Sequence, residues 1–126
     1  MVKTKTCVFI SGAGSNFFAL LKRSNNYNFP IKINLVISDN PRAKGLLIAR
    51  KMGIPSKIFK TKGLIHEVKI LKFLKEKKIS LILLAGYMKI LSKRFIKKFG
   101  KKIINIHPSL LPKFKGLNTY HKVCRI

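Results

Sequence analysis

The stretch TCVFISGAGSN, residues 6–16, decides the fold class of this chain. Its first half, residues 6–10, is apolar and β-branched, which is typical of a buried strand in a parallel sheet. A Ser-Gly pair ends the strand, and Ser15 or Asn16 then caps a helix that we expect to run to about Leu21. A buried strand that passes through a glycine-containing turn into a helix predicts an α/β protein.

Strand-like and helix-like segments alternate along the rest of the chain, and the helices carry lysines opposite an apolar stripe. The expected strands are Ile33–Ile37, a weaker Lys57–Phe59, Leu81–Ala85 and Ile103–Ile106, and the expected helices are Ala43–Met52, Leu64–Lys77 and Leu91–Phe99. This order favours right-handed crossovers. We therefore predict a Rossmann-like open parallel sheet with helices on both faces.

The composition is that of a globular protein of one domain, residues 1–126, with 47% hydrophobic residues. Cys7 and Cys124 are too few for a disulfide framework or a metal motif, so we expect no bound metal and a reducing, cytoplasmic setting. No apolar run approaches the roughly 18 residues of a membrane span, and no membrane partner is expected.

The chain is strongly basic: it has 28 Lys and Arg residues but only three acidic residues, Asp39, Glu67 and Glu76, which gives a net charge of +25. Such a charge suggests an anionic partner, such as nucleic acid, a membrane surface or a phosphorylated small molecule. Lysines are scattered through every expected helix and outnumber arginines, whereas proteins that read bases rely on arginine. A basic nucleic-acid-binding module is therefore kept as the less favoured interpretation.

The turn SGAGSN, residues 11–16, lies where an open parallel sheet binds its ligands, beyond the carboxyl ends of the strands. Glycines allow close backbone approach, and the free amides of a helix start attract phosphate. Phe17 takes the place of the third glycine in the dinucleotide fingerprint, and Asp39 is interpreted as a simple turn residue. A phosphate site and a tight turn without a ligand both remain open.

The stretch AGYMKIL, residues 85–91, follows the clearest buried strand. Gly86 permits close backbone approach, and the side chains after it would make an apolar wall for a flat ring system. The alternative is ordinary core packing between strand and helix, which periodicity alone favours.

The stretch NIHPSLLPKFKG, residues 105–116, places Asn105 and His107 on one face at the end of the last strand. An amide donor beside an imidazole suits a reaction that forms an oxyanion and moves a proton. A purely structural histidine is the alternative.

These motifs, together with LVISDNPRAKGLLIARKMGIP and GLNTY, resemble the phosphoribosylglycinamide formyltransferase family from Cys7 to about Tyr120. The resemblance implies transfer of a formyl group from 10-formyltetrahydrofolate to glycinamide ribonucleotide in de novo purine biosynthesis. It implies that Asn105 and His107 are catalytic. It further assigns Gly14, Ser15 and Asn16 to the substrate phosphate, and Met88, Lys89, Ile90, Leu91, Asn105 and Lys62 to the folate.

Chains of this family continue past residue 126 and supply an aspartate that raises the pKa of the catalytic histidine. We therefore expect this chain to be truncated and its turnover to be impaired, with a separate C-terminal half as a possible partner. A non-catalytic remnant that still binds phosphate or nucleotide is the alternative.

Overall fold

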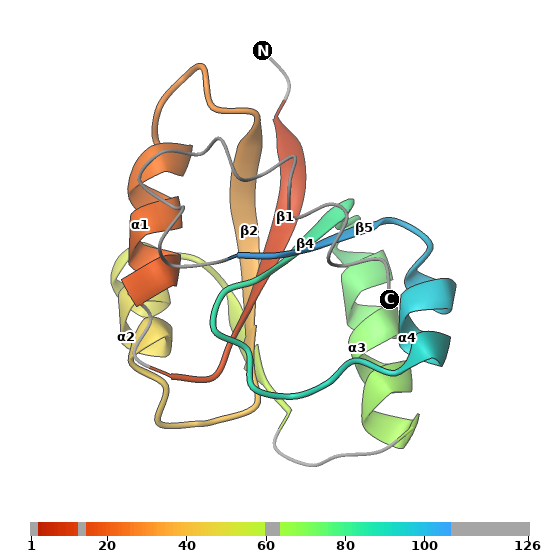
Figure 1. Ribbon diagram of the computed structural model, residues 1–126. Coiled ribbons are helices and arrows are strands. Elements are labelled where there is room, and N and C mark those ends of the chain that lie inside the picture. Colours follow the sequence, from red (N-terminus) through yellow and green to blue (C-terminus); the bar gives the residue numbers. More distant parts are fainter. Residues whose placement is uncertain (1–2, 13–14, 60–63, 107–126) are drawn as a thin grey trace.

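A computed structural model describes residues 3–12, 15–59 and 64–106 of the chain. Within these residues, five strands and four helices alternate (Figure 1). Their bounds are β1 Thr4–Ile10, α1 Ser15–Ser24, β2 Ile31–Ser38, α2 Lys44–Lys51, β3 Ser56–Ile58, α3 Leu64–Glu76, β4 Leu81–Leu84, α4 Lys93–Phe99 and β5 Lys102–Asn105. Gly14, Lys62 and His107, all predicted site residues, lie outside the described part.

The strands form one parallel sheet in the order β3-β2-β1-β4-β5. The chain builds outward from β1 to β3, then returns across β1 to add β4 and β5 on the other side. The order therefore reverses between β1 and β4, and ligands of open α/β sheets bind at the carboxyl ends of such a strand pair. The predicted Rossmann-like fold is confirmed.

The central strand β1 contributes side chains to two apolar cores, one on each face of the sheet. Val8 and Ile10 belong to the core under α1 and α2, whereas Cys7 and Phe9 belong to the core under α3 and α4. Figure 1 shows the two helix pairs on opposite faces of the sheet. Burial on both faces explains why the sequence of β1 is apolar without alternation.

The element boundaries differ from the sequence-based prediction by one to three residues; α1, for example, runs to Ser24 instead of about Leu21. The differences at α4 and β3 have local causes. Helix α4 begins at Lys93 instead of Leu91, because the Ser92 side chain caps it by accepting a hydrogen bond of 3.0 Å from the Phe95 amide. The short edge strand β3 begins one residue earlier than expected, although its pairing continues to Phe59, whose amide donates to the Ser38 carbonyl. The shift at α4 leaves residues 85–92 as a loop.

Within the part of the chain described above, no helix is long and apolar enough to cross a membrane. The same residues contain no cluster of three His, Cys, Asp or Glu side chains that would hold a metal ion. Cys7 is fully buried, and burial raises the pKa of its thiol well above the ordinary value.

Candidate active site at the carboxyl edge of the sheet

Ser11, directly after β1, joins the three loops that leave the carboxyl ends of β1, β2 and β4. Its hydroxyl donates to the Asp39 carboxylate over 2.5 Å and accepts from the Met88 amide over 2.8 Å. Its carbonyl accepts from the Asn40 side chain over 3.0 Å. Asp39 is thus more than a turn residue, because it fixes the hydroxyl that connects the loops.

The described residues on either side of the turn, Gly12 and the first turn of α1, are each fixed by contacts. The Gly12 carbonyl accepts from the Lys44 amide over 3.1 Å, which ties the turn to the start of α2. Phe17 is fully buried and anchors the first turn of α1, where Asn16 is half-buried. Among residues 3–12, 15–59 and 64–106, no atom lies within 4 Å of the position that a Cβ would take on Gly12.

The first turn of α1 also has the electrostatic character that an anion requires. Helix α1 carries no acidic residue there, and the backbone amides of a first turn lack partners within the helix. These amides, together with the helix dipole, favour a negatively charged group. Ser15 opens the helix, and its side chain lies outside the described part.

The loop of residues 85–92 contains both buried and exposed side chains. Gly86 has a φ of 72°, which lets the chain turn sharply after β4. Tyr87 packs edge-on against Phe9 with ring centroids 5.2 Å apart, whereas Met88 and Ile90 are 80% and 95% exposed. The core-packing interpretation is therefore wrong for Met88 and Ile90. Their apolar side chains face solvent.

Two neighbours of these exposed residues are half-buried, Lys89 and Leu91, and Leu91 packs against the core under α3 and α4. The far end of the loop is held by Glu67 of α3. Its two carboxylate oxygens accept from the Ser92 hydroxyl over 2.6 Å and from the Ser92 amide over 3.2 Å. The backbone of the loop is therefore held at Met88 and at Ser92, while the side chains of Met88 and Ile90 are exposed.

Asn105 is the last residue of β5 and lies opposite Leu84 in the register with β4. Pairing continues beyond it, because the Ile106 amide donates to the Leu84 carbonyl over 2.9 Å. Ile104 and Ile106 are buried in the core under α1 and α2, so strand alternation places Asn105 on the α3 and α4 face. Tyr87 packs on that same face, and Asn105 is exposed at the carboxyl edge.

Tyr87 is a titratable group whose pKa is shifted by its surroundings at this edge. Burial raises the pKa of Tyr87 to about 12, with smaller contributions from the negative charges of Asp39 and Glu67 and from Cys7. The phenol therefore stays protonated at neutral pH and remains a hydrogen-bond donor.

This shift predicts a loss of stability in alkali. Between pH 10 and about 12 the folded chain keeps the Tyr87 proton that the unfolded chain has released, so the free energy of unfolding falls as pH rises. Denaturant unfolding at several pH values, with and without Tyr87→Phe, measures this. The variant should lose that part of the decline; an unchanged slope would contradict the assignment.

Comparison with known proteins shows the family to which the chain belongs. Residues 4–125 match the formyl transferase family. The chain belongs to the formyl transferase family. The phosphoribosylglycinamide formyltransferase of Haemophilus influenzae is 42% identical over 122 residues, which is 94% of this chain and 58% of that protein. The human trifunctional purine biosynthetic protein adenosine-3 is 40% identical over 95% of this chain and 12% of that protein.

Solved structures of the family agree with the fold. The crystal structure of phosphoribosylglycinamide formyltransferase from Brucella melitensis has a TM-score of 0.79 and 43% identity, covering 97% of this chain and 66% of that one. A formyltetrahydrofolate deformylase from Pseudomonas putida has a TM-score of 0.76 and 26% identity, covering 84% of this chain and 38% of that one. The chain spans somewhat more than half the length of the bacterial formyltransferase of Haemophilus influenzae. The predicted family resemblance is confirmed.

The sequence-based prediction missed three residues that connect the loops at this edge. Ser11 was predicted only as part of a turn, Asp39 only as a turn residue, and Glu67 was given no role at the site. A signal was present, because Asp39 and Glu67 are two of only three acidic residues in the chain.

Proposed function

We propose that this chain forms the site at which a phosphoribosylglycinamide formyltransferase brings together glycinamide ribonucleotide and 10-formyltetrahydrofolate. One observation supports the proposal above the others. The carboxyl edge of the sheet, at the reversal of strand order, gathers the first turn of α1, the displayed loop of residues 85–92 and Asn105. The relatives at about 40% identity that carry this activity in their names supply the substrate class.

In this proposal each part of the edge has its own ligand. The phosphate of glycinamide ribonucleotide binds at Gly14, Ser15 and Asn16, where free helix amides and an absence of acidic side chains in the first turn favour a dianion. The folate ring lies against the exposed loop. Lys62, which the family resemblance assigns to the folate, lies near the ring in this proposal. The folate-binding loop residues are Met88, Lys89, Ile90 and Leu91.

The proposed chemistry is a direct acyl transfer. The amine of glycinamide ribonucleotide attacks the formyl carbon and forms a tetrahedral oxyanion. The Asn105 side-chain amide donates a hydrogen bond to that oxyanion. His107 moves the proton lost by the attacking amine toward the departing folate nitrogen, after which the carbon–nitrogen bond to the folate breaks. No metal ion has a role in this scheme.

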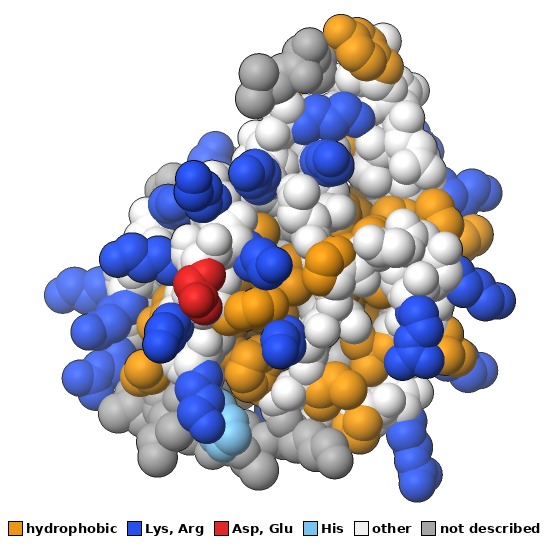
Figure 2. Space-filling view, turned by 180° about the vertical axis from the view of Figure 1, so that it is seen from behind, with side chains coloured by type: hydrophobic (Ala, Val, Ile, Leu, Met, Phe, Trp, Pro, Cys, Tyr) orange, Lys and Arg blue, Asp and Glu red, His pale blue; other side chains and the backbone are white. Residues whose placement is uncertain are grey.

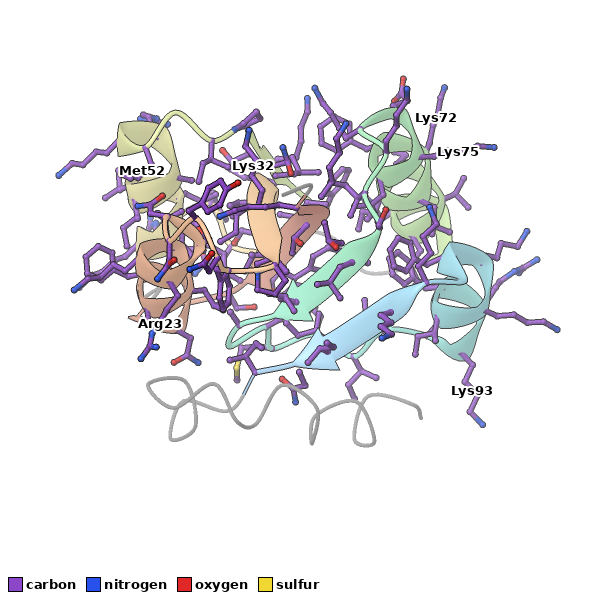
Figure 3. The ribbon with its side chains drawn as sticks, turned by 90° about the horizontal axis from the view of Figure 1, so that it is seen from above. Arg23, Lys32, Met52, Lys72, Lys75 and Lys93 are labelled. Carbon is purple, nitrogen blue, oxygen red and sulfur yellow. The ribbon has the colours of Figure 1, made fainter. Side chains whose placement is uncertain are left out.

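The proposal places the protein in purine biosynthesis in the cytoplasm, with residues 1–126 as one formyltransferase domain. The alternative of a nucleic-acid-binding module finds less support in the structure. On the face that Figure 2 shows, Lys and Arg side chains are spread without forming one stripe. Lys72 and Lys75 of α3 and Lys93 of α4 point outward in different directions (Figure 3). A spread of this kind gives no continuous track for a phosphate backbone.

Substitution of Asn16 tests the phosphate site. Asn16→Ala should weaken the binding of glycinamide ribonucleotide about 10- to 100-fold, because it removes a hydrogen bond to a charged group. Isothermal titration calorimetry of the whole chain and of the variant measures this. Asn25→Ala, an exposed residue just past α1, is the matched control and should bind as the unsubstituted chain does.

Two results would contradict the proposal. The first is no binding of glycinamide ribonucleotide to the unsubstituted chain at millimolar concentration, which would leave the turn without a ligand. The second is equal binding by Asn16→Ala and Asn25→Ala, which would show that Asn16 does not contact the phosphate. A formyl-transfer assay on the same preparation then separates a working enzyme from a chain that only binds.

A further inference from the structure

We propose that Ser11 and Glu67 are positioning residues, which hold the loop of residues 85–92 in the shape that receives the folate. The inference rests on the proposed function and extends it to two residues that bond to the backbone of the loop. Ser11 accepts from the Met88 amide in the middle of the loop, and Glu67 accepts from the Ser92 amide at its end. Their effect on the folate would be exerted through the loop.

The first anchor depends on the orientation of one hydroxyl group. Ser11 is 6% exposed, and its single proton is donated to the Asp39 carboxylate over 2.5 Å. That leaves the oxygen lone pairs directed at the Met88 amide, which donates over 2.8 Å. Because a charged acceptor makes the first bond strong, Asp39 fixes the hydroxyl in the state that holds Met88.

The second anchor lies four residues further along. Both oxygens of Glu67 accept from Ser92, one from its hydroxyl over 2.6 Å and one from its amide over 3.2 Å. The Ser92 hydroxyl in turn accepts from the Phe95 amide at the start of α4. Phe95 is buried in the core, so this anchor joins the loop, α3 and α4 at one point.

The anchored loop exposes two apolar side chains. Met88 and Ile90 face solvent on a backbone held at Met88 and at Ser92. Ordering a loop when a ligand binds costs affinity, and a loop ordered in advance avoids that cost. An anchored loop that exposes apolar groups is therefore suited to a flat ring ligand.

The positions of the acidic residues also support a role in holding the loop. The chain has three acids against 28 Lys and Arg residues, and two of the three hold this loop. Asp39 and Glu67 are both half-buried at the edge, whereas Glu76 is exposed at the end of α3. Glu76 therefore gives a control with the same charge on the same helix.

Amide hydrogen exchange of the unliganded chain, followed by NMR, tests whether the anchors hold the loop. Ser11→Ala should speed exchange of the Met88 amide about tenfold, and Glu67→Ala should do the same at Ser92, as local opening becomes easier. Glu67→Gln, which keeps one acceptor oxygen, should fall between Glu67→Ala and the unsubstituted chain. Glu76→Ala and Ser80→Ala, both at exposed positions, should leave both amides unchanged.

Calorimetry with tetrahydrofolate tests the consequence for binding. Glu67→Ala should weaken tetrahydrofolate binding about five- to tenfold, the cost of ordering a few loop residues, while binding of glycinamide ribonucleotide changes less than about twofold. This split is not expected from general destabilisation, which would affect both ligands. Glu76→Ala should change neither affinity.

The outcomes separate this inference from the proposed function. Unchanged exchange at Met88 and Ser92 in the variants would overturn the anchoring. Faster exchange with undiminished tetrahydrofolate affinity would overturn the role of the anchors in folate binding. If the unsubstituted chain binds no folate, the proposed function fails with the folate part of this inference, and the exchange rates alone decide whether the two side chains hold the loop.

Discussion

Asn105→Ala is expected to slow formyl transfer about 100- to 1,000-fold relative to the unsubstituted chain, the usual effect of removing one oxyanion donor. The loss should appear in kcat with little change in KM, because the oxyanion exists only in the transition state. Asn105 is exposed at the end of β5, so its truncation removes no core contact and the melting temperature should stay nearly constant. Steady-state kinetics with both substrates measures the effect.

Asn28→Ala is the matched control for this prediction, since it removes an exposed amide from the turn between α1 and β2. Its rate should equal that of the unsubstituted chain. A rate within about twofold for Asn105→Ala would exclude the proposed oxyanion contact, given the magnitude that such donors have elsewhere. A higher KM at constant kcat would instead assign Asn105 to ground-state binding.

Phe9→Ala is expected to lower the free energy of unfolding by about 3–5 kcal/mol. Phe9 is fully buried in the middle of the sheet and packs against Tyr87 at 5.2 Å and Phe95 at 6.3 Å between ring centroids. The loss is a large part of the total stability of about 5–15 kcal/mol that is typical of folded proteins. Because Tyr87 belongs to the loop of residues 85–92, the cavity should also loosen that loop. Urea unfolding followed by circular dichroism measures the change.

Phe9→Leu should cost less, under about 1.5 kcal/mol, because it keeps most of the volume. Phe18→Ala on α1 tests the role of burial directly, since that ring is 49% exposed and should contribute much less. If Phe18→Ala destabilised the chain as strongly as Phe9→Ala, the packing described for β1 would be wrong.

The strand and helix order could be predicted from the sequence because burial leaves a clear pattern. Residues 7–10 and Leu81–Leu84 are apolar throughout, and both lie in buried strands that pair in parallel. Gly53 and Gly100 mark ends of helices, and both have positive φ in the structure. The start of α4 was less clear, since Leu91 continues its apolar pattern while the side chain of Ser92 sets its actual beginning.

The connections within the site could not be predicted in the same way. Ser11 and Met88 are 77 positions apart, and their contact depends on β1 and β4 being neighbours, which periodicity does not reveal. Asp39 has the composition of a turn residue, and only the three-dimensional structure shows its bond to Ser11. The exposure of Met88 and Ile90 was equally hidden, because apolar residues after a buried strand more often pack into the core.

The position of the ligands on the carboxyl edge is tested most directly by an NMR titration of the whole chain. Glycinamide ribonucleotide should shift the amide signals of Gly12, Asn16 and the start of α1, and subsequent tetrahydrofolate should shift those of residues 87–91 and Asn105. Signals of the lysine-bearing α3 surface around Lys72 and Lys75 should stay in place. Shifts concentrated on that surface, or none at the carboxyl edge at saturating ligand, would contradict the account.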